Sequence, residues 1–488
     1  MNGNDHGINW SYVGLCVIVI IVIVELGYLI GGGSGGVMSI SELMEYNYKL
    51  WLISNAGLIH LNRSGCQWLK LLTNDPLLIK MHRRLQNKYG CVVKTYISTT
   101  MNYYILDQNL AKKILMASPM LFSAGKLKYD AFFKFMPLNL GISVGCPWKN
   151  RRNFNENVLG TKLSSDDIFS LSNRYSCLHT LVEKNLTIMN GPLLIIDDFR
   201  KLAFNLTSDI IFGICTCPQM EQSASVALLK QFMLTYDHLD PEFYQTYIDY
   251  LHLHLKQSQF TCSLLSEVNK ITNEYGRTLT SKEIDDQIPH WFGPFIYIIN
   301  FLIPNILCIL LSPNYTNVYK RLIREMNEPD FETSGIYSND TYLHHCVIEH
   351  IRLFNTININ IQRTVVNDIQ LAPNLYVKKG DQLFMLFASI LRDPKLFQEP
   401  DCFIPERWAN PNLAVSQDIV FGVGLQQCPS RRITPVLYKL LVYHIFKNTN
   451  IFKYTVLSPK LTSRELYFIN PFDITFYQSK NDAPQRLF

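Results

Sequence analysis

Hydrophobic and polar positions along the chain follow two different periods, and these separate predicted helices from predicted strands. Apolar residues recur at the three- and four-residue spacing of an amphipathic helix in five segments. These predicted helices cover residues 75–88, 107–118, 166–190, 224–256 and 339–354. Short apolar or alternating runs, typical of strands, occupy residues 91–97, 103–106, 370–377 and 382–387. Helix outweighs strand, so the pattern predicts a mainly α fold with minor β sheets.

One apolar segment near the N-terminus is long enough to cross a membrane. Residues 10–30 carry a single charge, Glu25, and a helix of this length spans about 32 Å, against a hydrocarbon core of roughly 30 Å. No Lys or Arg precedes it and no small-residue cleavage site follows, so a retained anchor fits better than a removable signal peptide. A peripheral helix is the alternative, but the segment is apolar all round rather than amphipathic.

The residues after this segment predict how the chain is organised. Five glycines and one serine fill residues 31–36, a composition typical of a flexible linker. Basic residues begin only at Lys49, which favours a cytosolic location for the rest of the chain. We therefore predict an N-terminal membrane anchor in residues 1–30, a Gly-rich linker in 31–44 and one large domain in 45–488.

Composition excludes several classes of protein. Of the 488 residues, 48% are hydrophobic and 17% charged, so the chain can bury a large core and is not globally disordered. A net charge of +5 is too small for a typical nucleic-acid-binding protein, and we expect no nucleic-acid partner. The twelve cysteines include no Cys-x-x-Cys pair, so neither a zinc ribbon nor a thioredoxin-like motif is present.

The strongest candidate for chemistry is a cysteine in a glycine-containing turn. Residues 421–432 read FGVGLQQCPSRR, and an apolar helix-like run follows at 436–446. Backbone N–H groups and the positive end of that helix would stabilise a thiolate at Cys428. Such a sulfur is a good iron ligand. Taken alone, the segment is also compatible with a buried structural cysteine beside a glycine turn.

Two further pairs have a helical spacing. Glu349 and Arg352 are three residues apart and lie on one face of a predicted helix, where such a pair is usually a solvated salt bridge. Trp148 and Arg152 are four residues apart, which an amphipathic helix with a buried tryptophan would also explain. Neither pair identifies a function by itself.

Together these segments resemble the cytochrome P450 family. The cysteine segment is similar to the family's loop, Phe-x-x-Gly-x-Arg-x-Cys-x-Gly-Arg. The matching residues are Phe421, Gly424, Cys428 and Arg431. Gln426 replaces the loop arginine, and Ser430 replaces the following glycine. The resemblance implies that Cys428 is the catalytic cysteine and the axial ligand of the iron of haem b, in a cytochrome P450 fold preceded by an N-terminal transmembrane helix.

Other motifs of the family occur in the family's order. The resemblance implies that Glu349 and Arg352 form its Glu-x-x-Arg pair, and that Arg407, in the Pro-Glu-Arg-Trp segment 405–408, completes a buried ion network. Trp148, Arg152 and Arg363 match positions at which the family holds the haem propionates, a task suited to arginine's fixed fork of donors. A zinc site built from His345, Cys346, Glu349 and His350 is a competing interpretation of the same helix, although it would need the Glu349 that the ion network uses.

The central helix departs from the family's pattern. Monooxygenases of this family carry Ala/Gly-Gly-x-Asp/Glu-Thr there, and the acid–alcohol pair helps to deliver protons during oxygen activation. The corresponding residues 289–311 contain no Thr and no Asp, and Gly293 is followed by a proline. Pro304 is expected to kink this helix. Family members that rearrange or dehydrate peroxides also lack the threonine, because their substrate already carries the oxygen.

The resemblance therefore implies a membrane-anchored haem-thiolate oxidoreductase. Its expected activity is that of a monooxygenase that inserts one oxygen atom from O2 into an apolar, lipid- or sterol-like small molecule. An NADPH-dependent reductase is the expected electron donor, docked near Lys149, Arg151 and Arg432. The alternatives are an isomerase or dehydratase of the same fold that acts on a peroxide without a reductase, and a catalytically degenerate haem-binding protein.

Overall fold

The computed structural model describes most of the chain beyond residue 75. The described residues are 76–97, 100–126, 129, 133, 136–160, 168–189, 196–212, 264, 279–354, 361–410, 413, 420–448, 454–457, 461, 463–466 and 474–478. The predicted anchor (1–30), the predicted linker (31–44) and the predicted helix at 224–256 lie outside them.

Helices make up most of the described part. The α-helices are α4 (Pro76–Tyr89), α5 (Gln108–Met116), α7 (Gly145–Val158), α8 (Ile168–Ile188), α9 (Ile196–Phe212), α13 (Ser281–Asp285), α14 (Ile288–Tyr297), α15 (Ile303–Leu310), α16 (Thr316–Met326), α17 (Tyr342–Leu353), α18 (Phe387–Ile390) and α20 (Ile433–Lys447). Four short helices are of other types: the wider π-helix η3 (Ile298–Leu302) and the tighter 3₁₀ helices η4 (Pro313–Tyr315), η5 (Gly335–Tyr337) and η6 (Pro405–Ala409). The mainly α prediction agrees with this content.

The strands form three small sheets. They are β1 (Val92–Ile97), β2 (Thr100–Ile105), β3 (Phe122–Ala124), β4 (Ile361–Val365), β5 (Ile369–Ala372), β6 (Leu375–Val377), β7 (Gln382–Met385), β8 (Tyr454–Leu457) and β9 (Thr475–Gln478). The largest sheet has the order β1-β2-β7-β4-β3, in which only β2 and β7 run parallel. The pairs β5-β6 and β8-β9 are separate antiparallel ribbons. The predicted single strand at 370–377 is thus a hairpin, because Asn374 adopts a φ of 64° and turns the chain.

Local capping explains where several helices begin and end. The Asp107 side chain accepts a hydrogen bond from the backbone N–H of Leu110 at 2.7 Å, which fixes the start of α5. Thr341 caps α17 in the same way through the N–H of His344. Gly90 ends α4 with a φ of 84°, a conformation that favours glycine after a helix.

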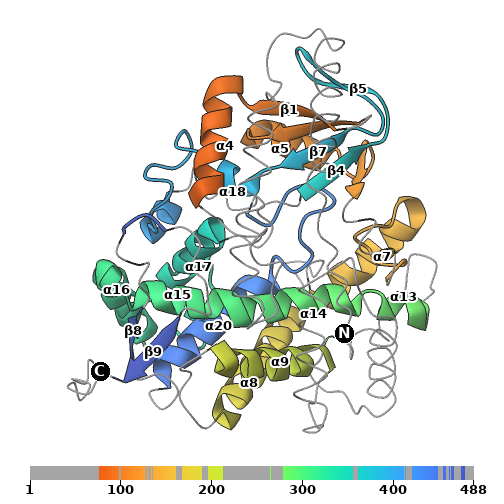
Figure 1. Cartoon of the computed structure of the whole chain (residues 1–488). Helices are drawn as coiled ribbons and strands as arrows, with labels where there is room; N and C mark the ends of the chain where they lie inside the picture. The colour runs from red at the N-terminus through yellow and green to blue at the C-terminus, as the bar shows by residue number, and fades with distance from the viewer. Residues whose placement is uncertain are drawn as a thin grey trace, which may run out of the picture.

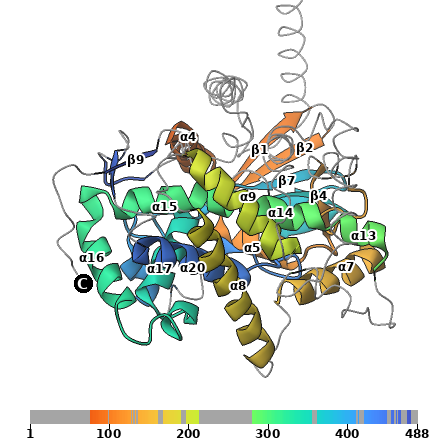
Figure 2. The same ribbon diagram turned by 90° about the horizontal axis from the view of Figure 1, so that it is seen from below.

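One long helical rod, α14–η3–α15, crosses the middle of the molecule between the sheet end and the pair α8 and α9 (Figure 1). The view from below shows α9 lying across it (Figure 2). Within the described residues, Ser281–Leu310 is the helix long and apolar enough to span a membrane. However, 83% of its most apolar 18-residue stretch is buried inside the molecule, as in a core helix. The rod therefore belongs to the protein core.

A π-helical turn interrupts this rod immediately before Pro304. The N–H of Ile303 bonds to the carbonyl of Ile298, five residues earlier. Pro304 thereby becomes the second residue of α15, where its missing N–H costs less than in a helix interior. Where the sequence predicted a kink at Pro304, the structure has a wider π-helical turn just before the proline.

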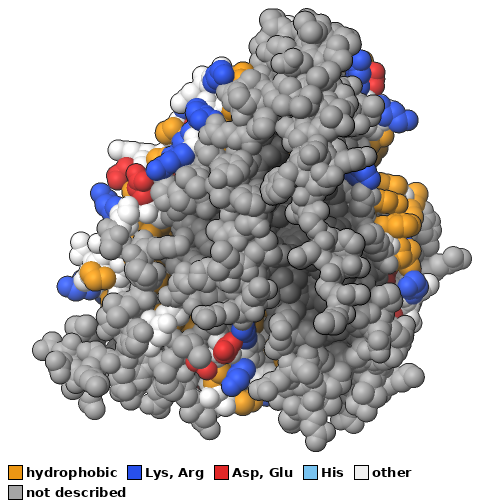
Figure 3. Space-filling view, viewed as in Figure 1, with side chains coloured by type: hydrophobic (Ala, Val, Ile, Leu, Met, Phe, Trp, Pro, Cys, Tyr) orange, Lys and Arg blue, Asp and Glu red, His pale blue; other side chains and the backbone are white. Residues whose placement is uncertain are grey.

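Charged side chains of both signs lie around the rim of the face drawn in Figure 3, and hydrophobic side chains gather at its right-hand edge. The large hydrophobic residues with most exposure include Met120 at 75%, Met116 at 62% and Val144 at 58%. Met116 and Met120 lie at and just after the end of α5 and Val144 directly precedes α7, whereas Ile188, 60% exposed, ends α8.

Lys439 is fully buried in α20, and its Nζ donates to the Ser338 carbonyl at 2.6 Å. Desolvation lowers its pKa to about 7, although Glu325 partly opposes this. Between about pH 7 and 10 the unfolded chain therefore binds more protons at this residue than the folded protein does. The stability of the protein consequently rises with pH across that range. We expect Lys439→Met to remove this rise and to add about 2 kcal/mol of stability at pH 7, less than the pKa difference implies because Ser338 loses a donor.

Urea unfolding at pH 7 and pH 9.5 measures this effect. The exposed Lys320 of α16 provides the control, and Lys320→Met should leave the pH dependence as it is in the unaltered protein. An unchanged pH dependence in Lys439→Met would contradict a neutralised buried lysine.

Candidate haem site

Cys428 lies in a tight loop that closes immediately before α20. The loop contains two residues with positive φ, Gly422 at 77° and Gly424 at 79°. The N–H of Cys428 donates to the Phe421 carbonyl at 2.8 Å, and the N–H of Gln427 donates to the Gly424 carbonyl at 3.0 Å. Phe421 itself packs against the main core. These bonds fix the cysteine in front of the N-terminus of a buried helix.

The sulfur of Cys428 has a polar neighbour. Its Sγ lies 3.2 Å from the hydroxyl oxygen of Ser430, at the position where the family usually has glycine. The Arg431 side chain donates to the Cys428 carbonyl at 3.2 Å. Cys428 as a whole residue is partly buried.

At Gly424 the cysteine loop lies directly against the C-terminal end of α5. A Cβ at this position would lie 2.7 Å from the Leu115 carbonyl oxygen and 2.9 Å from the Met116 Cα. Both are backbone atoms, which cannot swing aside as a flexible side chain can. The loop and the end of α5 are therefore in direct contact only because residue 424 lacks a side chain.

We expect Gly424→Ala to lower the free energy of unfolding by at least about 3 kcal/mol, because it adds a backbone clash to the strain of a positive φ. Gly380 is a matched control: its φ is 92° and nothing lies within 4 Å of its added Cβ. Gly380→Ala should cost only the strain, about 1–2 kcal/mol. Chemical unfolding of both variants gives the comparison, and equal losses would contradict the clash.

Arg152 and Trp148 lie one turn apart on α7, and both are buried. Arg152 pairs with Glu156 at 2.6 Å, while its Nε is buried and has no hydrogen-bond partner. Glu156 also faces Arg431 at 3.8 Å, and Arg431 bonds the Cys428 carbonyl. A chain of charged contacts thus connects α7 with the cysteine loop.

Arg363 of β4 approaches the same region from the sheet. Its Nε donates to the Ser118 hydroxyl at 3.2 Å, and its Nη1 donates to the Gln362 carbonyl at 2.9 Å. Ser118 follows α5, the helix whose end contacts Gly424. Desolvation lowers the pKa of Arg363 to about 10, and within the described part of the chain no carboxylate pairs with it. An anionic ligand would supply the missing counter-charge.

Glu349 lies at the centre of a buried ion network. Arg352 donates to it twice at 2.8 Å, Arg407 donates at 3.0 Å, and the Trp408 indole donates at 2.9 Å. Burial alone raises the pKa of Glu349, but Arg352 and Arg407 outweigh this and leave its pKa below the ordinary value. The carboxylate is therefore held ionised inside the core.

A second, largely buried ion network joins α4 to the segment before η6 and has no signature in the sequence. Arg392 donates to Asp401 at 3.0 Å, and Arg83 of α4 donates to the same carboxylate at 2.8 and 2.9 Å. Arg392 and Asp401 lie near the ion network in sequence, but Arg83 is 318 residues from Asp401. No sequence spacing connects them, so only the fold shows this link.

The helix α17 holds no metal-binding group in the described residues, although its spacing suggested a zinc site at His345, Cys346, Glu349 and His350. Glu349 is engaged by arginines, and His350 Nδ1 bonds the Tyr438 hydroxyl at 2.7 Å. Both side chains therefore already have other partners.

Arg151 was expected to belong to an exposed basic surface that docks a reductase, but it is buried. This side chain is only 7% exposed, and it pairs with Glu283 at 3.0 Å because α13 packs beside α7. Lys149 and Arg432 are exposed. Any electrostatic docking surface at this site would have to use those two residues without Arg151.

Asn300 is the residue of the central rod that sequence reasoning overlooked. It lies in the π turn η3, is 3% exposed, and its Oδ1 has no hydrogen-bond partner. Two residues later, the Leu302 carbonyl accepts a hydrogen bond from Tyr438 of α20 at 3.0 Å. An isolated polar residue in the apolar run 295–303 was the available signal.

Comparisons with known proteins agree with one family. The family model described as Cytochrome P450 matches residues 318–468. Mitochondrial cytochrome P450 11B1 of Ovis aries is 32% identical over 102 residues, which cover 20% of each chain. The mitochondrial cholesterol side-chain cleavage enzyme of Hypanus americanus is 29% identical over 106 residues, 22% of this chain and 20% of that protein. The matched segment thus spans about a fifth of these relatives.

Two solved structures share the fold over most of the chain. The retinoic-acid-bound cyanobacterial CYP120A1 superposes with a TM-score of 0.65 at 17% identity and covers 84% of this chain and 97% of its own. A zebra fish cytochrome P450 with abiraterone gives a TM-score of 0.60 at 15% identity, covering 82% and 100%. The two findings agree: residues 318–468 match the cytochrome P450 family, and the chain has the fold of cytochromes P450.

Proposed function

We propose that this protein is a haem-thiolate monooxygenase in which Cys428 binds the iron of haem b. The observation that carries the proposal is the position of Cys428, in a closed loop directly before the buried helix α20. Helix-terminal N–H groups favour the thiolate form that binds iron. The Phe421 carbonyl accepts the hydrogen bond that closes this loop, and Gly424 allows the loop to contact the end of α5. We propose that both residues thereby shape the face of the loop that contacts the cofactor.

The surrounding donors suit the carboxylates of a haem. Arg152 has a buried Nε without a partner, and Arg363 has a desolvated guanidinium that pairs with no described carboxylate. Arginine binds carboxylates through a planar fork of donors, and these bonds strengthen away from water. We assign the propionates to Arg152 and Arg363, with Trp148 as a further donor.

A bound haem would supply the oxygen chemistry, and thiolate ligation favours O–O cleavage. The tasks left to the protein are to hold the cofactor, to exclude water and to orient an apolar substrate. The rod α14–η3–α15 is buried and almost wholly apolar, which suits a lipid- or sterol-like small molecule. We propose that an NADPH-dependent reductase supplies electrons and that residues 1–30 anchor domain 45–488 to a membrane, with the domain in the cytosol.

The CO-difference spectrum of the reduced, haem-loaded protein tests the proposal. A thiolate-ligated haem should absorb at about 450 nm. A spectrum typical of imidazole ligation would contradict the assignment of Cys428 as the iron ligand. Substrate-dependent NADPH consumption with a reductase and a panel of lipids would then support monooxygenation, and a thiolate spectrum without any turnover would support the degenerate haem-binding protein.

The central rod gives a specific reason to keep the peroxide isomerase or dehydratase as a second candidate. Residues 289–311 provide no Thr or Asp to relay protons, whereas they do provide the buried amide of Asn300. An amide can hold a polar substrate group by hydrogen bonds but does not act as an acid at neutral pH. Turnover of a lipid hydroperoxide without reductase or NADPH would favour this candidate.

A further inference from the structure

Three segments that are distant in sequence bring two imidazoles and a carboxylate together. They are His179 of α8, Glu332 in the turn between α16 and η5, and His444 of α20. One possible ligand atom from each lies within 4.8 Å of the other two. His179 Nε2 and Glu332 Oε1 are 3.7 Å apart. These residue types are common ligands of zinc and similar divalent cations.

Two tyrosines orient two of these groups. The Tyr337 hydroxyl is 2.9 Å from His179 Nδ1, which leaves Nε2 facing the other two side chains. The Tyr443 hydroxyl donates to Glu332 Oε2 at 2.7 Å, which leaves Oε1 turned towards His179. Hydrogen bonds to the far side of a ligand are typical of protein metal sites, because they fix the tautomer and the orientation of the group.

His444 has a buried ring nitrogen without a partner. Its Nε2 is enclosed by protein and makes no hydrogen bond, although its ring contacts His179 edge-on with centroids 4.6 Å apart. Desolvation, and secondarily His179, lower the pKa of His444 to about 4, against the opposing effect of Glu332. The buried Nε2 without a hydrogen-bond partner is therefore the atom of this ring that would contact a metal ion.

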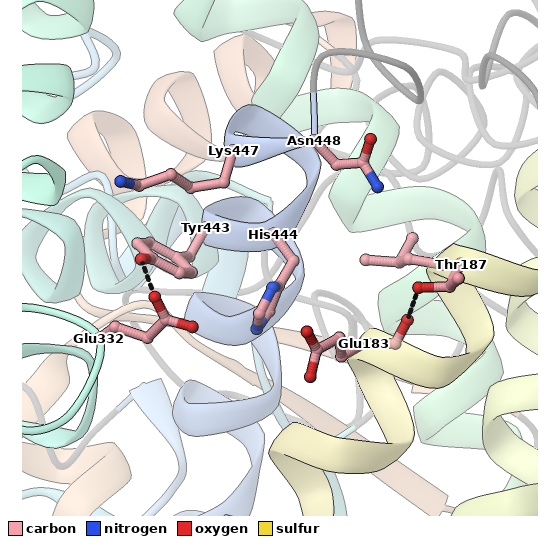
Figure 4. Close-up of a pocket in the computed structure, with 8 residues that line it drawn as sticks. Glu183, Thr187, Glu332, Tyr443, His444, Lys447 and Asn448 are labelled. Carbon is pink, nitrogen blue, oxygen red and sulfur yellow. Dashed lines mark hydrogen bonds between the residues drawn. The ribbon is translucent and has the colours of Figure 1, made fainter. Parts of the chain in front are cut away.

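The cluster borders a cavity of about 360 Å³ that Glu183, Glu332, Tyr443, His444 and Lys447 help to line. In Figure 4 the carboxylates of Glu183 and Glu332 flank the His444 ring from two sides. Glu183 follows His179 by four residues on α8, so the two share one face of the helix. The lining contains two carboxylates, Glu183 and Glu332, and one ammonium group, Lys447, so its charged side chains favour a cation.

We propose that His179, Glu332 and His444 form a divalent-cation site of the zinc type, with the cavity side of the metal completed by Glu183 or by water. Metal–ligand bonds of about 2.0–2.2 Å require the three ligand atoms to approach one another by roughly 1 Å. A bound ion would join α8, the Glu332 turn and α20, the helix that begins just after Cys428. This site is separate from the proposed haem chemistry and does not depend on it.

Isothermal titration of the full-length, haem-loaded protein with Zn²⁺ tests the site. Glu332→Gln and His444→Gln should each lose the binding event, and Tyr337→Phe, which keeps all ligands, should weaken it by about 10–100-fold. Glu328→Gln, an exposed residue four positions before Glu332, should bind like the unaltered protein. Zn²⁺ should also raise the melting temperature of the unaltered protein, and His444→Gln should lose this rise.

Two results would overturn the proposal. One is the absence of any Zn²⁺ binding to the unaltered protein at micromolar to millimolar concentration, and the other is equal binding by Glu332→Gln and the unaltered protein. Far-UV circular dichroism without metal identifies a variant that has failed to fold. Because Glu332 is exposed and Gln still accepts the Tyr443 hydrogen bond, Glu332→Gln should stay folded and keeps the test decisive.

Discussion

Replacing Glu349 by glutamine is expected to lower the free energy of unfolding by about 3–5 kcal/mol, a large part of the roughly 5–15 kcal/mol that holds a typical protein folded. The carboxylate accepts five hydrogen bonds: two from Arg352 and one each from Arg407, Trp408 and the Ile404 backbone. A glutamine would place an NH2 group where donors already point. It would also leave two arginines without their buried counter-charge.

The acid dependence of stability should change in the same variant. Because the pKa of Glu349 is lower in the folded protein than in the unfolded chain, its contribution is fully present above the unfolded pKa of about 4.3 and is lost as pH falls through the folded value. Glu349→Gln cannot titrate, so the part of acid destabilisation that comes from this group should disappear. Unfolding curves at pH 4 and pH 7 separate this effect from a general loss of stability.

Glu406 offers a matched control two residues from Trp408. It faces Arg321 at 3.5 Å with 48% of its side chain exposed, so water screens the pair. Glu406→Gln should cost less than about 1 kcal/mol, and the Tyr342 hydroxyl can still donate to the amide oxygen. If Glu349→Gln were as mild as Glu406→Gln, the buried network would not be a main source of stability.

Local pattern was enough to predict much of this fold. The predicted helices at 75–88, 107–118, 166–190 and 339–354 correspond to α4, α5, α8 and α17, because each has an apolar face and two of them begin at a capping side chain. The hairpin β5-β6 was read as one strand, since a turn residue with positive φ at Asn374 does not interrupt the apolar alternation. The π turn in the central rod was not foreseen, because period analysis cannot distinguish i−5 from i−4 bonding.

Contacts between distant segments were beyond sequence reasoning. Nothing in the chain links Ser118 to Arg363, yet their hydrogen bond and the Gly424 contact place the sheet and the cysteine loop on the same helix end. The cluster of His179, Glu332 and His444 likewise exists only because α8 packs on α20. Motif spacing finds residues on one element, whereas such sites depend on how elements pack.

Replacing Cys428 by serine is expected to abolish both the absorption at about 450 nm and substrate oxidation, while the fold remains. The bonds that close the loop come from the backbone, such as the 2.8 Å contact between the Cys428 N–H and the Phe421 carbonyl, so they do not need the sulfur. Serine is close to cysteine in volume, but its hydroxyl is not ionised at neutral pH and cannot replace a thiolate as an electron-donating ligand.

The control for this substitution is Cys146→Ser. Cys146 is an exposed free cysteine in the first turn of α7, two residues before Trp148. Its replacement changes the number of thiols by the same amount and should leave the spectrum and turnover unaltered. Haem content and far-UV circular dichroism of both variants show whether cofactor or fold is lost. A Cys428→Ser variant that kept the thiolate absorption would require another cysteine as ligand, and the placement of the loop before α20 would then have no chemical role.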